Sequence, residues 1–340
     1  MTFDSTATFC DWAMVDSSVR PLDWRDLPAL HRVRAQGLCL HAEVAFTRGP
    51  QTLQTALLDM LAPGRPTHTL VAPACEDGEP TAIGQILQRE PSAPARLVFL
   101  GPAEALAHAS GARLLDALCQ AAGQRGARNL IADVDEHSPA FECLRLAGFA
   151  IYARQRIWRQ EPARPPAPRG RGGLWRPESA GDGSALQALL ANLIPGLVQQ
   201  VETSPVRFRR GFVYWDEDEL RGFLDVERGP LGTWLQAYIH PAVETIDPLL
   251  AALLREVEIH PGRPLYMCVR SYQGWMSGPL TRFGFEPCSD QAVMVRRLAT
   301  VDRIPERVVR PALEGHAEPT APLARMGEVV VSGRWPVVSG

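Results

Sequence analysis

Hydrophobic spacing along the chain predicts alternating strands and helices in its first half. Residues 109–123 carry apolar side chains at helical spacing, whereas the apolar runs at 95–100 and 129–134 are typical of buried strands. Further strands are expected at 18–21, 69–74, 81–88 and 150–158, and further helices through 27–33, 51–61 and 140–146. This order predicts an α/β domain with a mixed sheet.

The second half repeats this order of elements. Strands are expected at 174–177, 210–215, 222–226, 232–240, 265–269 and 291–298, and helices at 185–193, 195–201, 248–257 and near 275–282. Gly148-Phe149 in the first half matches Gly284-Phe285 in the second, and Arg20-Pro21 matches Arg176-Pro177. Matching dipeptides in matching elements indicate a duplicated domain.

A stretch rich in proline and then glycine separates the two halves. It predicts an N-terminal domain at 1–160, a linker at 161–172, a C-terminal domain at 173–299 and a tail at 300–340. Each domain is expected to fold around its own core and also to pack against the other. The β-rich run at 327–338 is expected to dock as an added strand, with a frayed terminus as the alternative.

Composition excludes several classes of function. The net charge of −3 gives no electrostatic footprint for nucleic acid, and no apolar run reaches the length of a membrane span. Seven cysteines without a C-x-x-C pair argue against a metal site and favour a reducing, cytoplasmic setting. The chain has no lysine, through codon bias or through avoidance of self-acylation, so no lysine nucleophile operates. The oligomeric state stays open.

Local motifs in the first half resemble the GNAT superfamily of N-acetyltransferases. Val98–Pro102 resembles the central strand that ends in proline, and Gly111–Leu118 resembles the start of the helix under acetyl-CoA. Leu130–Val134 and Leu146–Phe149 resemble the strand and the Gly-Phe turn that follow. The resemblance implies two GNAT-like domains, each a central mixed, largely antiparallel sheet flanked by helices. It also implies acetyl-CoA as co-substrate.

The resemblance puts a candidate acyl-CoA site in the N-terminal domain. A helix N-terminus exposes unpaired amides and a positive dipole end to a pyrophosphate. The implied binding residues are Val98, Leu100, His108, Ala109, Ser110, Gly111, Ala112 and Arg113. Leu106 stands where the family has Gln or Arg, and Leu144 stands at the position of the family's tyrosine acid. No catalytic residue is therefore identified.

The corresponding loop of the C-terminal domain departs further from the family pattern. Residues 241–248 contain no glycine, and Asp247-Pro248 predicts a helix cap that places a carboxylate where the pyrophosphate would lie. The tyrosine position is Leu280. This half is expected to have a structural or substrate-shaping role.

The residues and the resemblance together are consistent with two functions. The first is transfer of an acetyl or acyl group from acetyl-CoA to a small amine. The alternative is a catalytically silent GNAT-fold module for binding or regulation. Trp215, Trp234 and Trp275 are candidates for a substrate cleft or for ordinary core packing.

Overall fold

The computed structural model describes residues 19–49, 66–74, 79–90, 93–161, 175–202, 211–243, 246–257 and 262–299. The helix expected at 51–61, most of the linker and the tail with its β-rich run lie outside these residues.

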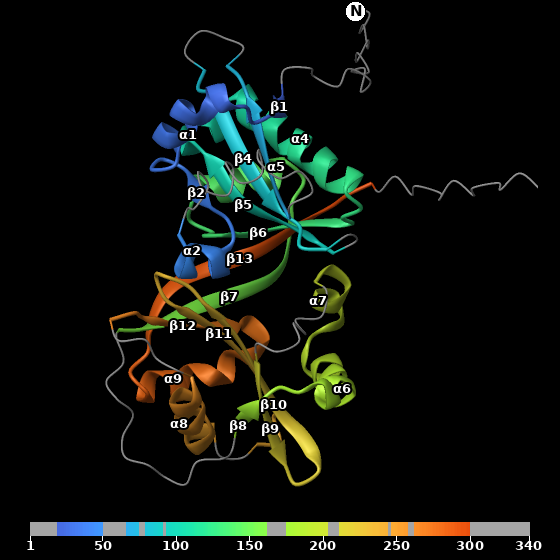
Figure 1. The fold of residues 1–340 in the computed structure, drawn as a ribbon, viewed down its shortest axis with the longest axis vertical. Helices are drawn as coiled ribbons and strands as arrows, with labels where there is room; N and C mark the ends of the chain where they lie inside the picture. Colours follow the sequence, from blue (N-terminus) through green and yellow to red (C-terminus); the bar gives the residue numbers. More distant parts are fainter. Residues whose placement is uncertain are drawn as a thin grey trace, which may run out of the picture. The chain divides into compact units, whose positions relative to one another are not determined.

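The elements of the N-terminal half follow the predicted order closely (Figure 1). They are β1 (Arg20–Pro21), η1 (Trp24–Asp26), α1 (Leu27–Val33), β2 (Leu38–Cys39), α2 (Ala42–Thr47), β3 (Thr67–Ala72), β4 (Ala82–Leu87), β5 (Ala95–Gly101), η2 (Ala103–Ala107), α4 (Ala109–Gln124), β6 (Asn129–Val134), α5 (Pro139–Leu146) and β7 (Ala150–Gln160). The segment with β2 and α2 was not expected from the sequence.

The C-terminal half repeats the series. Its elements are β8 (Trp175–Pro177), η3 (Ala180–Asp182), α6 (Gly183–Leu193), α7 (Gly196–Val201), β9 (Gly211–Asp216), β10 (Glu219–Arg228), β11 (Thr233–Ile239), α8 (Ile246–Glu256), β12 (Leu265–Arg270), η4 (Ser271–Met276), α9 (Ser277–Arg282) and β13 (Glu286–Arg297). Helix α6 packs on β10 and β11, and α4 packs on β3 and β4 in the other half.

The strands form one mixed sheet in the order β1-β3-β4-β5-β6-β13-β7-β12-β11-β10-β9-β8, with β2 added to β5. Among the strands of the described ranges, only β5·β6 and β11·β12 pair in parallel, and every other neighbouring pair is antiparallel. The predicted fold class is therefore confirmed: each half is a largely antiparallel mixed sheet with flanking helices.

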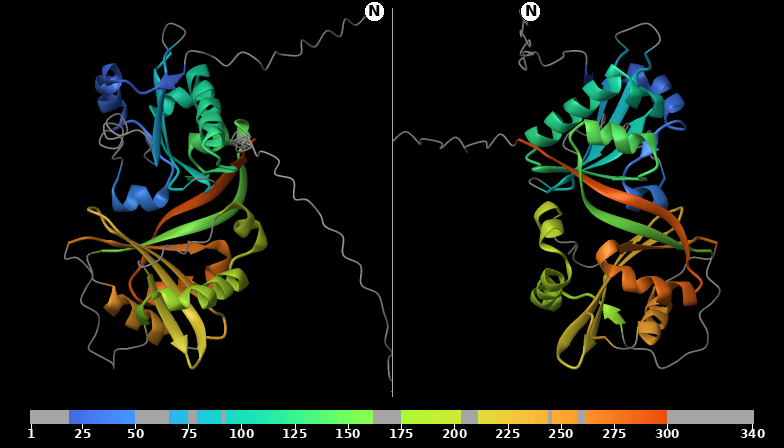
Figure 2. Two further views of the ribbon diagram at one scale, coloured as in Figure 1. Left: turned by 45° about the vertical axis from the view of Figure 1, so that its right-hand side comes forward. Right: turned by 180° about the vertical axis from the view of Figure 1, so that it is seen from behind.

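The two halves exchange their last strands. Strand β7 from the first half pairs with β12 of the second, and β13 from the second half pairs with β6 of the first. Figures 1 and 2 show β7 and β13 crossing the middle of the sheet side by side. As a result, Met294 belongs to the N-terminal core and Trp158 to the C-terminal core. Neither core is built from its own half alone.

Local details support the duplication. Gly148 and Gly284 both adopt left-handed backbone conformations, with φ of 82° and 78°, a region that favours glycine. Arg20 forms two hydrogen bonds to Asp26, and Arg176 forms two to Asp182 at the same spacing of six residues. The Arg-Pro dipeptides noted in the sequence thus begin equivalent strand-to-helix corners.

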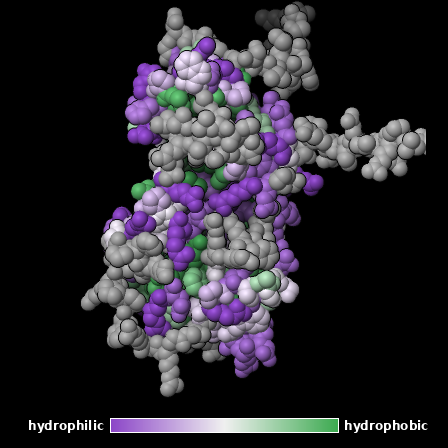
Figure 3. All heavy atoms as spheres, in the orientation of Figure 1, coloured by the Kyte–Doolittle hydropathy of each residue, from purple (hydrophilic) through white to green (hydrophobic). Residues whose placement is uncertain are grey.

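The described surface carries no broad apolar face in the view of Figure 3. Large exposed apolar side chains are few and come from separate elements; they are Trp24, Leu146, Leu197, Leu231 and Trp275. Single exposed apolar residues are normal on a folded protein.

Candidate functional site

In the N-terminal half, the gap between the diverging parallel strands is filled by the chain itself. Strands β5 and β6 pair only at Ala95–Arg96, after which β5 continues to Gly101 beside β4 but no longer beside β6. A segment from the connection between α1 and α2, Leu38–His41, runs into this gap and is called the inserted segment here. The Leu40 amide donates to the Val98 carbonyl (2.9 Å), and the Asp133 amide donates to the Leu40 carbonyl (2.8 Å).

Side chains hold the inserted segment in place. The Ala42 amide donates to Oδ2 of Asp133 at 2.8 Å. His41 is 3% exposed, and its burial, together with the nearby Arg96 guanidinium, lowers its pKa to about 4. The histidine is therefore neutral near pH 7, as burial of an imidazole favours.

A carboxylate from the same half covers the start of helix α4. The Ser110 amide donates to Oε1 of Glu79 (2.5 Å), and Arg113 reaches Oε2 of Glu79 (3.4 Å) and the Pro73 carbonyl (3.0 Å). A Cβ on Gly111 would lie 2.2 Å from the Ala105 carbonyl oxygen, so packing already requires glycine here. The amide and the cation predicted to meet a pyrophosphate meet Glu79 instead.

The structure brings the predicted acyl-CoA residues together around the end of β5 and the start of α4. Val98, Leu100, Ser110 and Gly111 are buried, and Arg113 is half-buried. His108, Ala109 and Ala112 are exposed at the start of helix α4. The Leu100 position pairs with Leu38, and Val98 accepts from the inserted segment. In this conformation the Val98 carbonyl, the Ser110 amide and the Arg113 side chain are paired within the chain, so acyl-CoA would have to displace these contacts. The assignment stays a prediction.

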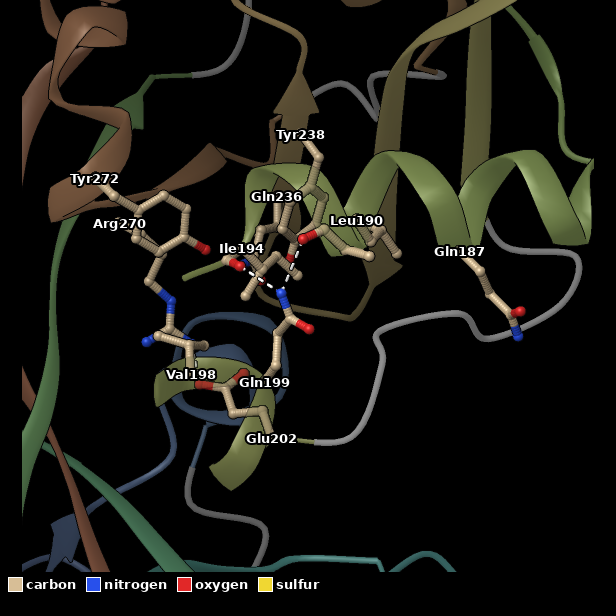
Figure 4. A pocket seen from close by; sticks show the side chains of 11 residues that line it. Gln187, Leu190, Ile194, Val198, Gln199, Glu202, Gln236, Tyr238, Arg270 and Tyr272 are labelled. Carbon is tan, nitrogen blue, oxygen red and sulfur yellow. Dashed lines mark hydrogen bonds and ion pairs between the residues drawn. The ribbon is translucent and has the colours of Figure 1, made fainter. Parts of the chain in front are cut away.

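In the C-terminal half, the equivalent gap is not filled by a chain segment among the residues described. Strands β11 and β12 pair in parallel as far as Gln236 and Cys268 and then diverge. The connection between α6 and α7 is only Ile194 and Pro195, whereas that between α1 and α2 runs from Arg34 to His41. A cavity of about 280 Å³ lies at this place in the C-terminal half (Figure 4).

The cavity has an apolar wall and a polar wall. Helices α6 and α7 and their connection supply Leu190, Ala191, Ile194 and Val198. The remaining lining residues are polar; they are Gln187, Gln199, Glu202, Gln236, Tyr238, Arg270 and Tyr272. In Figure 4, Arg270 and Tyr272 lie on one side of the cavity and Gln187 on the other. This combination is typical of a site for a small organic molecule.

Three of the polar lining groups are already engaged or hold a proton at neutral pH. The Gln199 amide donates to the carbonyls of Ala191 (2.9 Å) and Ile194 (2.6 Å), which fixes the corner between the helices. Burial raises the pKa of Tyr272 to about 12 and raises that of Tyr238 well above its ordinary value. Both phenols therefore remain O–H donors across the physiological range.

A buried ionic cluster links the cavity to the N-terminal half. Oε1 of Glu202 accepts from Arg270 (2.8 Å) and from the Tyr152 hydroxyl (2.5 Å), and Oε2 lies 3.6 Å from Arg96. Burial alone would raise the pKa of Glu202, but Arg270 and Arg96 outweigh it and lower that pKa. Glu202 is thus an anion held between one cation of each half.

The Arg270 guanidinium is only partly satisfied by this cluster. The residue is 4% exposed, and its Nε and Nη1 atoms are buried with no hydrogen-bond partner among the described residues. A buried donor without a partner costs about 1–3 kcal/mol, so such groups commonly mark a place where something else binds.

The C-terminal half lacks a recognisable acyl-CoA site among the residues described. The Gln273 side chain accepts from the Arg270 amide (3.2 Å) and donates to the Ala237 carbonyl (2.6 Å), so it bridges the diverging strands. At the start of α8, Asp247 pairs with Arg282 at 2.6 Å and 2.9 Å. Asp247 thus places a carboxylate at the start of this helix, where a pyrophosphate would meet negative charge.

No phenol occupies the family's tyrosine position in either half. Leu144 and Leu280 are both 0% exposed and belong to the two cores. A leucine cannot protonate a leaving thiolate, as the sequence already indicated.

Sequence reasoning missed the cavity residues. The three tryptophans proposed for a substrate cleft do not line this cavity. The Trp234 ring stacks on that of Phe46, and the Trp215 indole donates a hydrogen bond to Asp182. Trp275 is exposed on the surface. One signal was present, because Arg270 follows directly on the apolar run 265–269 at the end of a strand. A charge at that point is typical of sites at the carboxyl ends of parallel strands.

Two further features bear on function. Within the described ranges, no group of three or more His, Cys, Asp or Glu side chains is arranged to hold a metal ion. None of the helices there is long and apolar enough to span a membrane.

Solved structures match most of the chain. A GCN5-related N-acetyltransferase from Sphaerobacter thermophilus matches 84% of this chain and 96% of its own, at 13% identity and a TM-score of 0.47. A tandem GNAT protein from the clavulanic acid biosynthesis pathway matches 84% and 99%, at 16% identity and a TM-score of 0.48. A GCN5-related N-acetyltransferase from Kribbella flavida matches 82% and 70%, at 16% identity and a TM-score of 0.41.

No protein-family model and no curated protein matches the sequence. The strand order, the two diverging parallel pairs and the repeated corners show two copies of one α/β unit within a single sheet. GNAT stays the family that the sequence motifs resemble.

Proposed function

We propose that this protein is a GNAT-fold binding protein that takes up a small molecule in the cavity of its C-terminal half. One observation carries the proposal: the gap between the parallel strands is closed by Leu38–His41 in one half and forms a cavity of about 280 Å³ in the other. That volume lies just below the usual range for ligand sites, roughly 300–1,000 Å³. It suits a metabolite better than a nucleotide-bearing coenzyme.

Acyl transfer from acetyl-CoA to a small amine is the second candidate. The arrangement of β5 and α4, which carry Val98, Leu100 and the residues from Ala109 to Arg113, favours it. Acyl-CoA would have to displace the Leu40 amide from Val98 and the Glu79 carboxylate from Ser110. Both displacements cost hydrogen bonds that are made within the protein.

Calorimetric titration of the intact protein with acetyl-CoA distinguishes the two candidates. The binding proposal predicts no saturable heat with the wild type. Glu79→Ala, which uncovers the start of α4, is the variant most favourable to coenzyme binding, and Glu142→Ala on the exposed face of α5 is its control. Saturable binding to the wild type, together with turnover of an amine acceptor, would replace the first candidate by the second.

A fragment screen by thermal shift tests the cavity itself. Leu190→Trp fills the apolar wall and should abolish every stabilisation that arises there, whereas Leu197→Trp, at an exposed position of α7, should leave it intact. A screen in which no compound distinguishes these two variants would contradict a ligand site in this cavity.

A further inference from the structure

The chemistry of the cavity indicates what kind of molecule it takes. Its polar wall contains Arg270, whose Nε and Nη1 donors lack partners among the described residues. Oε1 of the neighbouring Glu202 already accepts two hydrogen bonds, and its Oε2 lies 3.6 Å from Arg96. The missing partner of the two Arg270 donors is an acceptor. Arginine presents its donors as a planar fork that matches a carboxylate in two places.

We infer that the cavity binds a small carboxylic acid with an apolar body, its carboxylate on Arg270 and its body on the α6–α7 wall. This inference rests on the proposed function and names the class of ligand for the same site.

The buried cluster beside the cavity balances its own charges. Within it, Arg96 and Arg270 face Glu202 and Asp133, two cations against two carboxylates. Both carboxylates pair with Arg96, whereas Nε and Nη1 of Arg270 have neither as a hydrogen-bond partner. Both nitrogens are buried, so neither a carboxylate of the cluster nor bulk water satisfies them.

The remaining lining fits an apolar body with limited polarity at its far end. Leu190, Ile194 and Val198 present aliphatic side chains along the helical wall. Gln187 lies across the cavity from Arg270 in Figure 4, where it can meet a polar group at the other end of the molecule.

Three probes of equal length isolate the head group: hexanoate, hexanamide and hexylamine. Each is titrated into the intact protein, and binding is followed by calorimetry and by thermal shift. Hexanoate should bind at least tenfold more tightly than the amide, and the amine should not bind.

Arg270→Lys and Arg96→Lys form a matched pair of variants. Both keep a cation beside Glu202, but only the first removes the forked donors from the cavity. Hexanoate affinity should fall at least tenfold in Arg270→Lys and change less than twofold in Arg96→Lys. Both proteins should retain cooperative unfolding, which shows that a loss of affinity is not a loss of fold.

The possible outcomes test two claims separately: that the ligand is a carboxylic acid, and that the cavity binds a ligand at all. Hexanamide or hexylamine binding as tightly as hexanoate, and weakened by Leu190→Trp, overturns the carboxylate while leaving the cavity as a binding site. Hexanoate binding that is equal in the two lysine variants also overturns it. If none of the three probes binds and no fragment distinguishes Leu190→Trp from Leu197→Trp, the inference and the proposed function both fall.

Discussion

The two halves of this protein repeat the same elements and differ most at one place, the gap where a parallel strand pair opens. In the N-terminal half the connection from Arg34 to His41 is long enough to enter the gap and to bridge β5 and β6. In the C-terminal half Ile194 and Pro195 join the helices directly, and a cavity remains. Loop length between the first two helices thus decides whether the equivalent site is closed or open.

The comparison extends to charge. The N-terminal half neutralises the start of α4 with Glu79, which is its own carboxylate. The C-terminal half presents Arg270 to its cavity with two donors that no described residue accepts from. The polar groups at the start of α4 in the N-terminal half are therefore paired within the chain, whereas two donors of Arg270 in the C-terminal half are not.

The largest effect is expected from Glu202→Gln. This change removes the anion shared by Arg96 and Arg270 and leaves two cations close together in the interior. Breaking a buried ion pair costs about 3–5 kcal/mol, and the lower end applies because the Glu202 side chain is 19% exposed. Urea unfolding should show this loss, whereas Glu142→Gln on the surface should leave the midpoint unchanged. Equal midpoints for the two variants would show that the cluster does not tie the halves together.

His41 should make the closed half sensitive to acid. Its pKa of about 4 in the folded state lies below the unfolded value of 6.5, so the unfolded chain binds a proton that the folded chain does not. The contribution of neutral His41 to the free energy of unfolding is fully present above pH 6.5. It is lost as the pH falls toward 4, and the loss amounts to about 3 kcal/mol in total.

The comparison of wild type with His41→Gln isolates this contribution. The free energy of unfolding is measured in urea between pH 7 and pH 4, and the difference between the two proteins should narrow or reverse as the pH falls. A difference that stays constant with pH would mean that His41 is not buried in its neutral form.

The repeated corners give a direct test of one half against the other. Asp182 is 2% exposed and accepts from Arg176, Ser179 and Trp215, whereas Asp26 bonds to Arg20 and the Asp23 amide. Asp182→Ala should cost about 2–3 kcal/mol and Asp26→Ala about 1 kcal/mol. Thermal unfolding of both variants measures the difference, and the reverse order would contradict the closer packing of the second corner.

A smaller effect than that of Asp182→Ala is expected from Glu79→Gln. It removes a negative charge that faces both the start of α4 and Arg113, but it keeps an acceptor for the Ser110 amide. Charge at a helix N-terminus contributes about 0.3–1 kcal/mol and the ion pair adds about as much, so the loss of stability should be about 1–2 kcal/mol. Denaturant unfolding at low and high salt checks this, since the effect should shrink as salt is added. A salt-independent loss would point to packing instead.

Much of the fold could be predicted because its strands are marked by local pattern. The strand predicted at 129–134 has the same bounds in the structure, since continuous apolar residues are buried on both faces of a sheet. Strand β2 was missed because its two residues become a strand only through pairing with β5. Strand β13 begins earlier than predicted, at Glu286, because the exposed residues there are held by pairing with β7 and not by burial.

The strand exchange and the cavity could not be predicted in the same way. The order of strands is set by contacts between residues far apart in sequence, and β7 carries the same alternation whichever neighbour it takes. Glu202 and Arg270 meet in space but share no motif. The acyl-CoA site was predicted from the motif that contains Gly111. In the structure, a glycine is required there because the Ala105 carbonyl lies too close for a Cβ.

Hydrogen exchange on the intact protein, with and without acetyl-CoA, tests the contrast between the two halves most directly. The amides of Leu40, Ala42 and Asp133 hold the inserted segment in the gap. These three amides should exchange slowly, and acetyl-CoA should not change their rates. Fast exchange at Leu40 and Asp133, or loss of their protection when acetyl-CoA is added, would show that the N-terminal gap opens to the coenzyme and would contradict a closed half.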